Sequence, residues 1–483
     1  MATSSRRDFL KAAGALTGVA LLPHAAHGAG VDTRLAALAR RAAAEEHGWG
    51  RVPSILARIV PPTFPDREFS VARFGAKGNG ATDCSEAFRR AIAACSSAGG
   101  GRVVVRDGTY LTGPIHLRSG VNLEVAEGAT IRFVTDPKAY ELYVTTRFES
   151  VEMLGLSPFI YAWEATNVAI TGKGTLDGQA GNEHWWNWNG NPRYGWTQGQ
   201  GNQRAARARL FQMAEQGVPV AQRRFGVESF LRPNFIQPYR SRNVLIEGVT
   251  IRNSPMWEIN PVLCSNVTVR DVEISSHGPN NDGCDPESSR DVLIERCRFD
   301  TGDDCIAIKS GRNADGRRLD VPSEDIVVRD CEMRDGHGGV TIGSEISGGV
   351  RHVYAERNTM NSPRLDRALR LKSNAMRGGT LEHIYVRDCK VGQVADAVLH
   401  VDLTYEEGAN GPYPPVIRDV EMLRVTSGKS TYALYLRGLE KATIDDVRVI
   451  DCTFENVAKP NVVEHVTNLA LRGVTVNGRK VSS

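Results

Sequence analysis

The stretch Asn243-Val-Leu-Ile-Glu-Gly-Val249 decides the fold, because its pattern returns many times along the chain. Each copy opens with Asn, Asp or His, continues in most cases with Val or Ile, and then has apolar residues at alternate positions. Further copies begin at Asn266, Asp291, Asp325, His352, His383, Asp419, Asp446 and Asn468. Alternation with a period of two, in segments rich in β-branched residues, predicts that every copy is a strand.

Successive copies start between 22 and 36 residues apart, which indicates a solenoid. A repeat in the twenties with insertions of variable length is typical of a parallel β-helix whose coils carry loops of different size. The 48 glycines and the scarcity of helix-forming runs after position 100 agree with an all-β chain. We therefore expect one parallel β-helix over residues 66–478, preceded by a lead-in at 29–65.

Cysteine occupies the seventh position of several copies, namely Cys297, Cys331, Cys389 and Cys452. Residues at one position of successive coils stack about 4.8 Å apart, so we expect these cysteines to be buried as small apolar groups. A metal cluster is the alternative, although no CxxC pair with zinc spacing occurs in the chain. Whether Cys84 and Cys95 form a disulfide is left open by the sequence.

A short amphipathic helix is expected just before the first strands, ending at Gly99-Gly-Gly101. Its apolar face would cover the open end of the β-helix, because an exposed terminal coil invites pairing with other chains. The residues on that face are Ala87, Phe88, Ala91, Ile92 and Cys95.

The first residues follow the order of an export signal. Ser5-Arg-Arg-Asp-Phe-Leu-Lys11 precedes an apolar stretch at 12–22 and small residues at 25–30. The paired arginines predict a twin-arginine signal over residues 1–28, with the twin-arginine export machinery as partner and a periplasmic or secreted destination. An ordinary basic amphipathic helix is the alternative, and the apolar stretch is too short to span a bilayer. No other segment resembles a membrane span, and a net charge of +3 gives no sign of a nucleic-acid partner.

Residues 179–238 interrupt the repeat with a segment rich in Trp, Gly and Asn. We interpret it as an elaborated loop beside a binding cleft, with a helical stretch at 203–216. Aromatic rings dominate both sugar-binding surfaces and small cores, so the sequence leaves these two roles open. The tryptophans concerned are Trp163, Trp185, Trp186, Trp188 and Trp196.

Three neighbouring coils carry a cluster of carboxylates. Aligned on the serines that end their segments, Asp282 falls above Asp304. Counted from the start of their copies, Asp303 and His337 share the same offset of 12 residues. We therefore expect these four side chains to meet on one face of the β-helix. Asp commonly fills turns without any further role, but four groups in register favour a functional site.

Strand alternation places Lys309, Arg370 and Lys372 outward on the same face. Such cations suit a substrate that carries carboxylates, which Arg can hold through two hydrogen bonds. Close carboxylates do not all ionise easily, so one of them retains a proton that it can donate. Cleavage of a glycosidic bond needs that combination of a protonated acid and a carboxylate that activates water.

Four segments resemble, in order and spacing, the signature segments of the polygalacturonase family, glycoside hydrolase family 28. They are Asn280-Asn-Asp282, Gly302-Asp-Asp304, Gly336-His-Gly338 and Arg370-Leu-Lys372. The similarity covers about residues 66–475 and is of the bacterial exo-polygalacturonase kind. Asn281 stands where the family usually has Thr, and Leu371 where it usually has Ile; neither change removes a reactive group.

The resemblance implies a single-stranded, right-handed parallel β-helix of the pectin-lyase-like type, and an inverting hydrolase of α-1,4-galacturonosyl linkages without metal or cofactor. It makes Asp303 the general acid, kept protonated by His337, while Asp282 and Asp304 activate the water. The substrate, an acidic plant polysaccharide or oligogalacturonide, would contact Arg370, Lys372, Lys309, Tyr405 and Asn280, of which Lys309 rests on strand alternation alone.

Other readings stay open. A calcium-dependent pectate lyase shares the fold and clusters aspartates, and relatives that hydrolyse rhamnogalacturonan or xylogalacturonan share the motifs. A non-catalytic carbohydrate-binding β-helix would also present these side chains. The insertion at 179–238 favours exo action, because it would close one end of the cleft.

Overall fold

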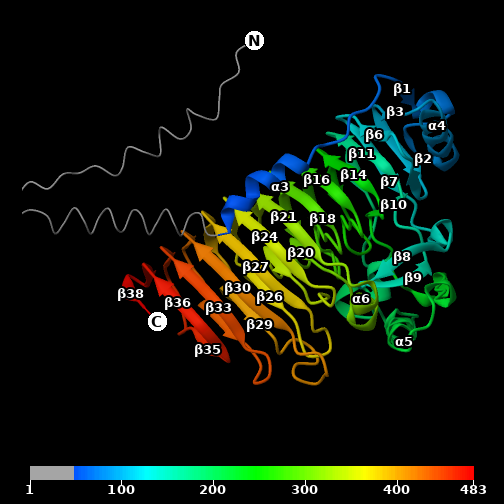
Figure 1. The fold of residues 1–483 in the computed structure, drawn as a ribbon. Coiled ribbons are helices and arrows are strands. Elements are labelled where there is room, and N and C mark those ends of the chain that lie inside the picture. Colours follow the sequence, from blue (N-terminus) through cyan, green and yellow to red (C-terminus); the bar gives the residue numbers. More distant parts are fainter. Residues whose placement is uncertain (1–47, 483) are drawn as a thin grey trace, which may run out of the picture. The chain divides into compact units, whose positions relative to one another are not determined.

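Each coil of the structure, a computed structural model that describes residues 48–482, contributes strands to stacked parallel sheets. In the two long sheets each internal strand pairs with the equivalent strands one coil before and one coil after, so these sheets run the length of the stack (Figure 1). The predicted right-handed parallel β-helix is confirmed. All described strands lie in one compact unit that begins at Arg51. The predicted export signal lies outside the described residues.

The first long sheet contains the repeat copies and is called the back sheet here. Its strands are β1 (Glu68–Ser70), β3 (Gly101–Val105), β6 (Val121–Val125), β11 (Thr166–Gly172), β14 (Arg242–Glu247), β16 (Ser265–Arg270), β18 (Arg290–Glu295), β21 (Ser323–Arg329), β24 (Val350–Glu356), β27 (Thr380–Arg387), β30 (Val416–Leu423), β33 (Ile444–Ile450) and β36 (Val466–Arg472).

The second long sheet follows the back sheet in every coil after a tight turn. Its strands are β2 (Asn79–Asp83), β4 (Gly108–Thr112), β7 (Ala129–Phe133), β12 (Thr175–Asp177), β15 (Thr250–Arg252), β17 (Glu273–Ser276), β19 (Arg298–Thr301), β22 (Glu332–Met333), β25 (Thr359–Asn361), β28 (Lys390–Gln393), β31 (Thr426–Ser427), β34 (Thr453–Phe454), β37 (Val474–Val476) and β38 (Arg479–Val481).

The third face, called the site sheet here, consists of a three-stranded and a six-stranded sheet that single bridges at Ile259 and Cys284 connect. Its strands are β5 (Ile115–Leu117), β10 (Ile160–Trp163), β13 (Ile236–Tyr239), β20 (Ile306–Ile308), β23 (Val340–Ile342), β26 (Arg367–Lys372), β29 (Ala397–Asp402), β32 (Tyr432–Arg437) and β35 (Val462–Glu464). Beside it, β8 (Val144–Phe148) and β9 (Val151–Gly155) form an antiparallel hairpin.

Helices are few and short, and none in residues 48–482 is long and apolar enough to cross a bilayer. The α-helices are α3 (Val52–Arg58), α4 (Ser85–Ser97), α5 (Arg204–Glu215) and α6 (Asn313–Leu319). The 3-10 helices are η1 (Trp49–Arg51), η2 (Val71–Phe74), η3 (Pro137–Tyr140), η4 (Trp186–Asn189), η5 (Pro192–Tyr194), η6 (Val220–Gln222) and η7 (Val227–Ser229).

The polar residue that opens each repeat copy has a conformational reason. From Asn243 to Asn468, all nine opening residues have φ between +51° and +58°. Most side chains avoid this left-handed region, whereas Asn, Asp and His enter it more readily than other non-glycine residues. Each opening residue therefore puts a left-handed kink into its back-sheet strand, and most of the Val, Ile or Leu residues that follow it are buried.

The seventh position of the repeat is buried, as predicted for the cysteine column. Cys297, Cys331, Cys389 and Cys452 each expose 2% or less of their surface. All nine cysteines of the chain are buried and free, so Cys84 and Cys95 do not form a disulfide. Burial raises the pKa of the Cys389 and Cys452 thiols to about 12.

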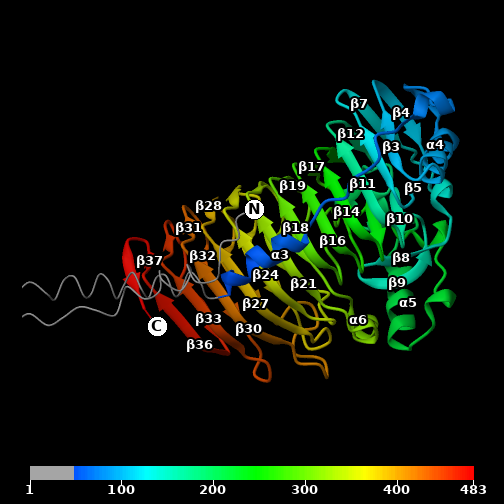
Figure 2. The ribbon, with the colours of Figure 1, turned by 45° about the horizontal axis from the view of Figure 1, so that its top comes forward.

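Both ends of the stack are closed. Helix α4 packs on β1, β3 and β5 at one end, as Figure 1 shows, and the five residues predicted for its apolar face are the five that it buries. At the other end β38 turns back and pairs antiparallel with β37, which ends the parallel repeat. Figure 2 shows α3 lying across the back sheet, where Arg58 pairs with Asp291 and Asp325.

The insertion packs partly as a small core and partly beside the site. Trp185 is 2% exposed and belongs to the main core, with ring centroids 5.4 Å from Tyr140 and 5.0 Å from Trp188, which favours a packing role for this residue over sugar binding. The predicted helix forms as α5, next to the β8–β9 hairpin and α6 (Figure 1). Trp163 remains 40% exposed.

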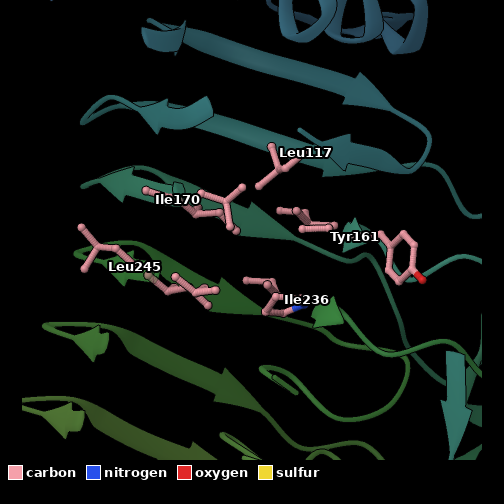
Figure 3. Close-up of a pocket in the computed structure, with 12 residues that line it drawn as sticks. Leu117, Tyr161, Ile170, Ile236 and Leu245 are labelled. Atoms are coloured by element: carbon pink, nitrogen blue, oxygen red, sulfur yellow. The ribbon is translucent and has the colours of Figure 1, made fainter. Parts of the chain in front are cut away.

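A small apolar gap lies between the back sheet and the site sheet (Figure 3). Leu117, Tyr161, Ile170, Ile236 and Leu245 are among its lining residues, and its volume is about 10 Å³. A water molecule needs at least that much room and several polar partners. The gap is therefore a packing defect of the solenoid and has no capacity for a substrate.

Candidate active site

Strand register brings the four predicted groups together on the site sheet. Cys284 bridges to Ile306, which puts Asp282 over Asp304, and Ile306 pairs with Val340, which puts Asp303 over His337. Both alignments made from the sequence are therefore confirmed. Oxygens of Asp282, Asp303 and Asp304 all lie within 4.8 Å of one another.

Asp303 is the most exposed of the three aspartates and is paired with His337. Its Oδ1 lies 3.0 Å from His337 Nδ1, and the exposed fractions of the two side chains are 19% and 51%. The hydrogen bond to Asp303 raises the pKa of His337 to about 9. Burial alone would raise the pKa of Asp303, but the hydrogen bond from His337 together with the positive charges of His337 and Lys372 lowers that pKa.

The pairing therefore corrects one expectation, that His337 keeps Asp303 protonated. A cationic imidazole favours the ionised form of the carboxyl beside it. In the free protein the shared proton is held on His337, and Asp303 is the carboxylate of the pair.

Asp304 is fully buried and bound by two cations. Lys372 Nζ lies 2.8 Å from Oδ2, Arg370 Nη1 lies 3.2 Å from Oδ1, and the Thr341 hydroxyl donates to Oδ1 at 2.9 Å. Burial would raise the pKa of Asp304, yet Lys372 and Arg370 hold it well below its usual range. These two cations thus favour the ionised form of Asp304.

Tyr405 lies beside the same two cations, as the resemblance implies. Its ring centroid is 5.3 Å from Lys372 Nζ and 5.8 Å from the Arg370 guanidinium carbon. Arg370 and Lys372 therefore lie between a buried carboxylate on one side and an aromatic ring on the other, which fixes both side chains in place.

Lys309 points out of the core, as strand alternation requires, but it is not available to solvent. Only 3% of its side chain is exposed, and its Nζ lies 4.5 Å from the Trp257 ring centroid. Carboxylate oxygens of Asp282, Glu345 and Asp285 surround it at 3.5, 3.5 and 3.7 Å. This geometry favours a role in holding those acids over the predicted contact with substrate.

The acids around Lys309 differ in charge. Burial, reinforced by Asp285 and Asp303, raises the pKa of Asp282 well above its usual range. Burial opposes ionisation of Glu345 as well, but Lys309 and Arg312 lower its pKa to about 2. Glu345 is therefore the carboxylate that neutralises Lys309, and Asp282 is a site at which a proton can be held.

Asn280 lies at the rim of the cluster, and its Oδ1 accepts a hydrogen bond of 2.7 Å from Arg232. Sequence reasoning missed Arg232, which lies in the insertion outside the repeat, and also Glu345 and Trp257, which lie within the coils but outside the motif segments. Asp285 lies in the same segment as Asp282. It directly follows Cys284, which stacks on Ile259 and faces the core, so strand alternation points Asp285 outward. This position is the signal that could have identified it.

The closeness of the three aspartates also raises the question of a metal ion, since carboxylate oxygens are the ligands that calcium prefers. Asp304 already carries Lys372 and Arg370, and Asp282 lies next to Lys309. An added divalent cation would meet these three positive charges at close range, so the donor set fits such an ion poorly.

Comparisons with known proteins agree with this site. The profile of glycosyl hydrolases family 28 matches residues 227–475, and that of the twin-arginine translocation pathway signal sequence matches residues 3–23, so the protein is exported. A crystal structure of a hyperthermoactive exopolygalacturonase from Thermotoga maritima superposes with a TM-score of 0.88 and 47% identity, over 90% of this chain and 97% of that one.

Two further relatives are more distant. A probable polygalacturonase of Vitis vinifera is 28% identical over 413 residues, which is 82% of this chain and 75% of the relative. An exo-poly-alpha-D-galacturonosidase of Dickeya chrysanthemi is 28% identical over 357 residues, 70% of this chain and 57% of the relative. Together with the family profile over residues 227–475 and the 47% identity over nearly the whole chain, these matches lead to one conclusion: the protein belongs to glycoside hydrolase family 28.

Proposed function

We propose that this enzyme hydrolyses the α-1,4-galacturonosyl linkages of polygalacturonate from the chain end, with inversion of configuration. The observation that carries the proposal is the arrangement of Asp303, Asp282 and Asp304 beside Arg370 and Lys372. It combines proton-transfer groups with cations that suit an acidic sugar. The matched polygalacturonases of a bacterium and a plant support the same substrate.

Asp303 is the proposed general acid, and His337 is its source of protons. The pair holds one proton, on the imidazole, while water still reaches both side chains. A bound galacturonate removes that water and brings a negative charge, and both changes raise the pKa of the Asp303 carboxyl group. The proton then moves to Asp303 and from there to the leaving oxygen.

Asp282 and Asp304 are the proposed partners of the attacking water. Asp304 is held ionised by Lys372 and Arg370, so it can accept a hydrogen bond from water at all times. Asp282, in its ionised form, takes up the proton that the water releases, and its raised pKa makes it the stronger base of the two. Arg370 and Lys372, with Tyr405 against them, would bind the galacturonate carboxylate next to the scissile bond.

The exo preference is supported by a chain of ion pairs that ties the insertion to the site. Lys309 contacts Glu345 at 3.5 Å, Glu345 contacts Arg312 at 3.2 Å, and Arg312 contacts Glu149 of the β8–β9 turn at 3.6 Å. Arg207 of α5 then holds Glu149 at 2.6 Å. This packing would fix α5 next to the carboxylates, where it would obstruct passage of a long polymer.

Inversion rests on the family resemblance. Inverting enzymes usually separate their carboxyl groups by about 6.5–9.5 Å and retaining enzymes by about 5–5.5 Å, so the distances within 4.8 Å here would by themselves favour retention. Proton NMR of the first-formed product decides the matter, because inversion of an α-linkage yields the β-anomer before mutarotation.

The reaction itself is tested by incubating the mature protein with polygalacturonate in EDTA. Reducing ends, ultraviolet absorbance of unsaturated uronate and product length are followed together. We expect reducing ends without new absorbance, and monomer from the first time point. Rising absorbance in EDTA would mean a lyase that needs no calcium, and absorbance that rises only after calcium is added back would mean a calcium-dependent lyase. Long oligomers at early times would mean endo action, and activity only on rhamnogalacturonan or xylogalacturonan would reassign the substrate.

A further inference from the structure

Arg232 is a buried cation in the insertion that the mechanism above does not use. Its side chain is 1% exposed, and its four hydrogen bonds all go to neutral oxygens. Nη1 donates to the carbonyl oxygens of Pro255 at 2.8 Å and Pro279 at 2.6 Å. Nε donates to Gln203 Oε1 at 3.1 Å, and Nη2 to Asn280 Oδ1 at 2.7 Å.

These bonds join three parts of the molecule. Gln203 immediately precedes α5, Pro255 lies in the coil before the site, and Pro279 and Asn280 begin the segment that leads to Asp282. An arginine has five donors in a rigid plane, so it fixes the relative positions of its acceptors better than a lysine would. Arg232 therefore sets where the segment 279–282 lies.

The same contact fixes the orientation of the Asn280 amide. A guanidinium group has donors only, so the atom of Asn280 that faces it must be the oxygen. The Nδ2 group then points away from Arg232. Nδ2 has no acceptor among residues 48–482, and Asn280 is half-buried at the rim of the cluster. Its two N–H donors are thus available to a ligand.

A charge without a carboxylate partner is costly to bury and is usually retained for a reason. No described acid lies within ion-pair distance of Arg232, and the acids that act on it over a longer range include Glu149, Asp282 and Asp303. Burial lowers its pKa to about 10, which still leaves it charged at neutral pH.

We propose, on the basis of the proposed hydrolase function, that Arg232 is a positioning residue, which holds the segment 279–282 and turns the amide donors of Asn280 toward a hydroxyl or carboxylate of the galacturonate. The insertion would thereby take part in substrate recognition through Asn280 as well as through any direct contact. Removal of Arg232 would allow the amide to rotate and would let the segment shift relative to Asp303.

A double-mutant cycle tests this coupling. Asn280→Gly removes the amide and tolerates the φ of +55° at this position. We expect Arg232→Lys and Asn280→Gly each to lower kcat/KM by roughly 10–100-fold, the usual range for hydrogen bonds to charged groups. The kcat/KM of the double variant should be no lower than that of the more impaired single variant, because both changes remove the same interaction. Losses that multiply would overturn the proposal.

Arg223→Lys is a matched control. Arg223 lies in the same insertion and is also 1% exposed, but it pairs with Asp315 at 2.8 Å instead of the catalytic segment. We expect Arg223→Lys to lower the thermal midpoint and to combine with Asn280→Gly multiplicatively. Thermal unfolding of all variants shows whether they are folded. A cycle for Arg223 that matched the one for Arg232 would also overturn the proposal.

The pH profile is a readout that a purely structural role would not move. The charge of Arg232 favours the ionised forms of Asp282 and Asp303, so its removal raises their pKa values. The acid limb of kcat/KM should move to higher pH in Arg232→Met and stay in place in Arg232→Lys and Arg223→Lys. If the parent enzyme cleaves polygalacturonate but the limb stays in place in Arg232→Met, this inference fails alone; if the parent enzyme is inactive, the proposed function fails first.

Discussion

Two sets of opposite charges run along this β-helix, and they differ in burial. The residue that follows the back-sheet strand in each coil alternates between an acid and a base from one coil to the next. The residues in this turn column are Asp271, Arg296, Asp330, Arg357, Asp388, Arg424 and Asp451. Pairs such as Asp330–Arg357, at 2.8 Å, leave about two fifths of each side chain exposed. On the site sheet, Asp304 is fully buried and faces Arg370 and Lys372 together.

The difference shows what burial does to the same chemistry. In the turn column water screens each charge, so each pair contributes little to stability. In the site, the charges lack water and are shared unequally, so pKa values move far from their usual ranges. The substitutions below compare these two regions.

Asp303→Asn should have the largest effect. Loss of the general acid should lower kcat on polygalacturonate by roughly 10²–10⁴-fold, with little change in stability. Asp330→Asn, the same chemical change in the turn column, should leave kcat within about twofold of the parent value, because Asp330 only screens Arg357. Rates from reducing-end assays check both. Comparable losses in the two variants would remove the distinction between the regions.

Lys372→Met should affect both stability and binding. It leaves Asp304 buried with Arg370 as its remaining cation, and breaking a buried pair costs about 3 kcal/mol. It also removes one of the cations proposed to bind the substrate carboxylate, so KM should rise. Denaturant unfolding and steady-state kinetics measure the two effects. A variant with the stability of the parent would mean that Asp304 takes up a proton at little cost.

His337→Gln should change the pH dependence more than the maximum rate. With His337 present, the proton shared with Asp303 is lost only as pH rises through about 9. Without the imidazole, the proton is held by Asp303 alone and is lost at lower pH. The alkaline limb of kcat/KM should therefore move downward in pH. An unmoved alkaline limb would show that the transferred proton comes from another group, such as Asp282.

Arg357→Met should have the smallest effect, less than about 1 kcal/mol in unfolding free energy and none on kcat. Its half-exposed guanidinium pairs with Asp330 and lies 2.8 Å from Glu356. Chemical denaturation checks the value. A loss as large as that of Lys372→Met would mean that the alternating column stabilises the solenoid cooperatively.

The sequence predicted what the repeat controls. Opening residues such as Asn243 recur because each coil needs a left-handed bend, and that period is enough to place Asp282 over Asp304 and Asp303 over His337. The apolar face of α4 was predicted for a similar reason, since a helix that covers a core must be amphipathic.

Residues outside the repeat could not be placed in this way. Arg232 comes from the insertion, where no period indicates a neighbour. The orientation of Lys309 was predicted, but its burial depends on Trp257 and Glu345 from other segments. The location of the proton between Asp303 and His337 depends on a distance of 3.0 Å that strand alternation does not define.

The column of buried thiols has a consequence for how the protein leaves the cell interior. A twin-arginine substrate folds before it is exported, so its nine cysteines enter the core while the surroundings are still reducing. At the oxidising destination each sulfur is inaccessible and, where its pKa is raised as in Cys389, protonated, and a thiol in that state does not react. The enzyme can therefore carry nine cysteines into an oxidising environment and yet have no need of a disulfide-forming catalyst there.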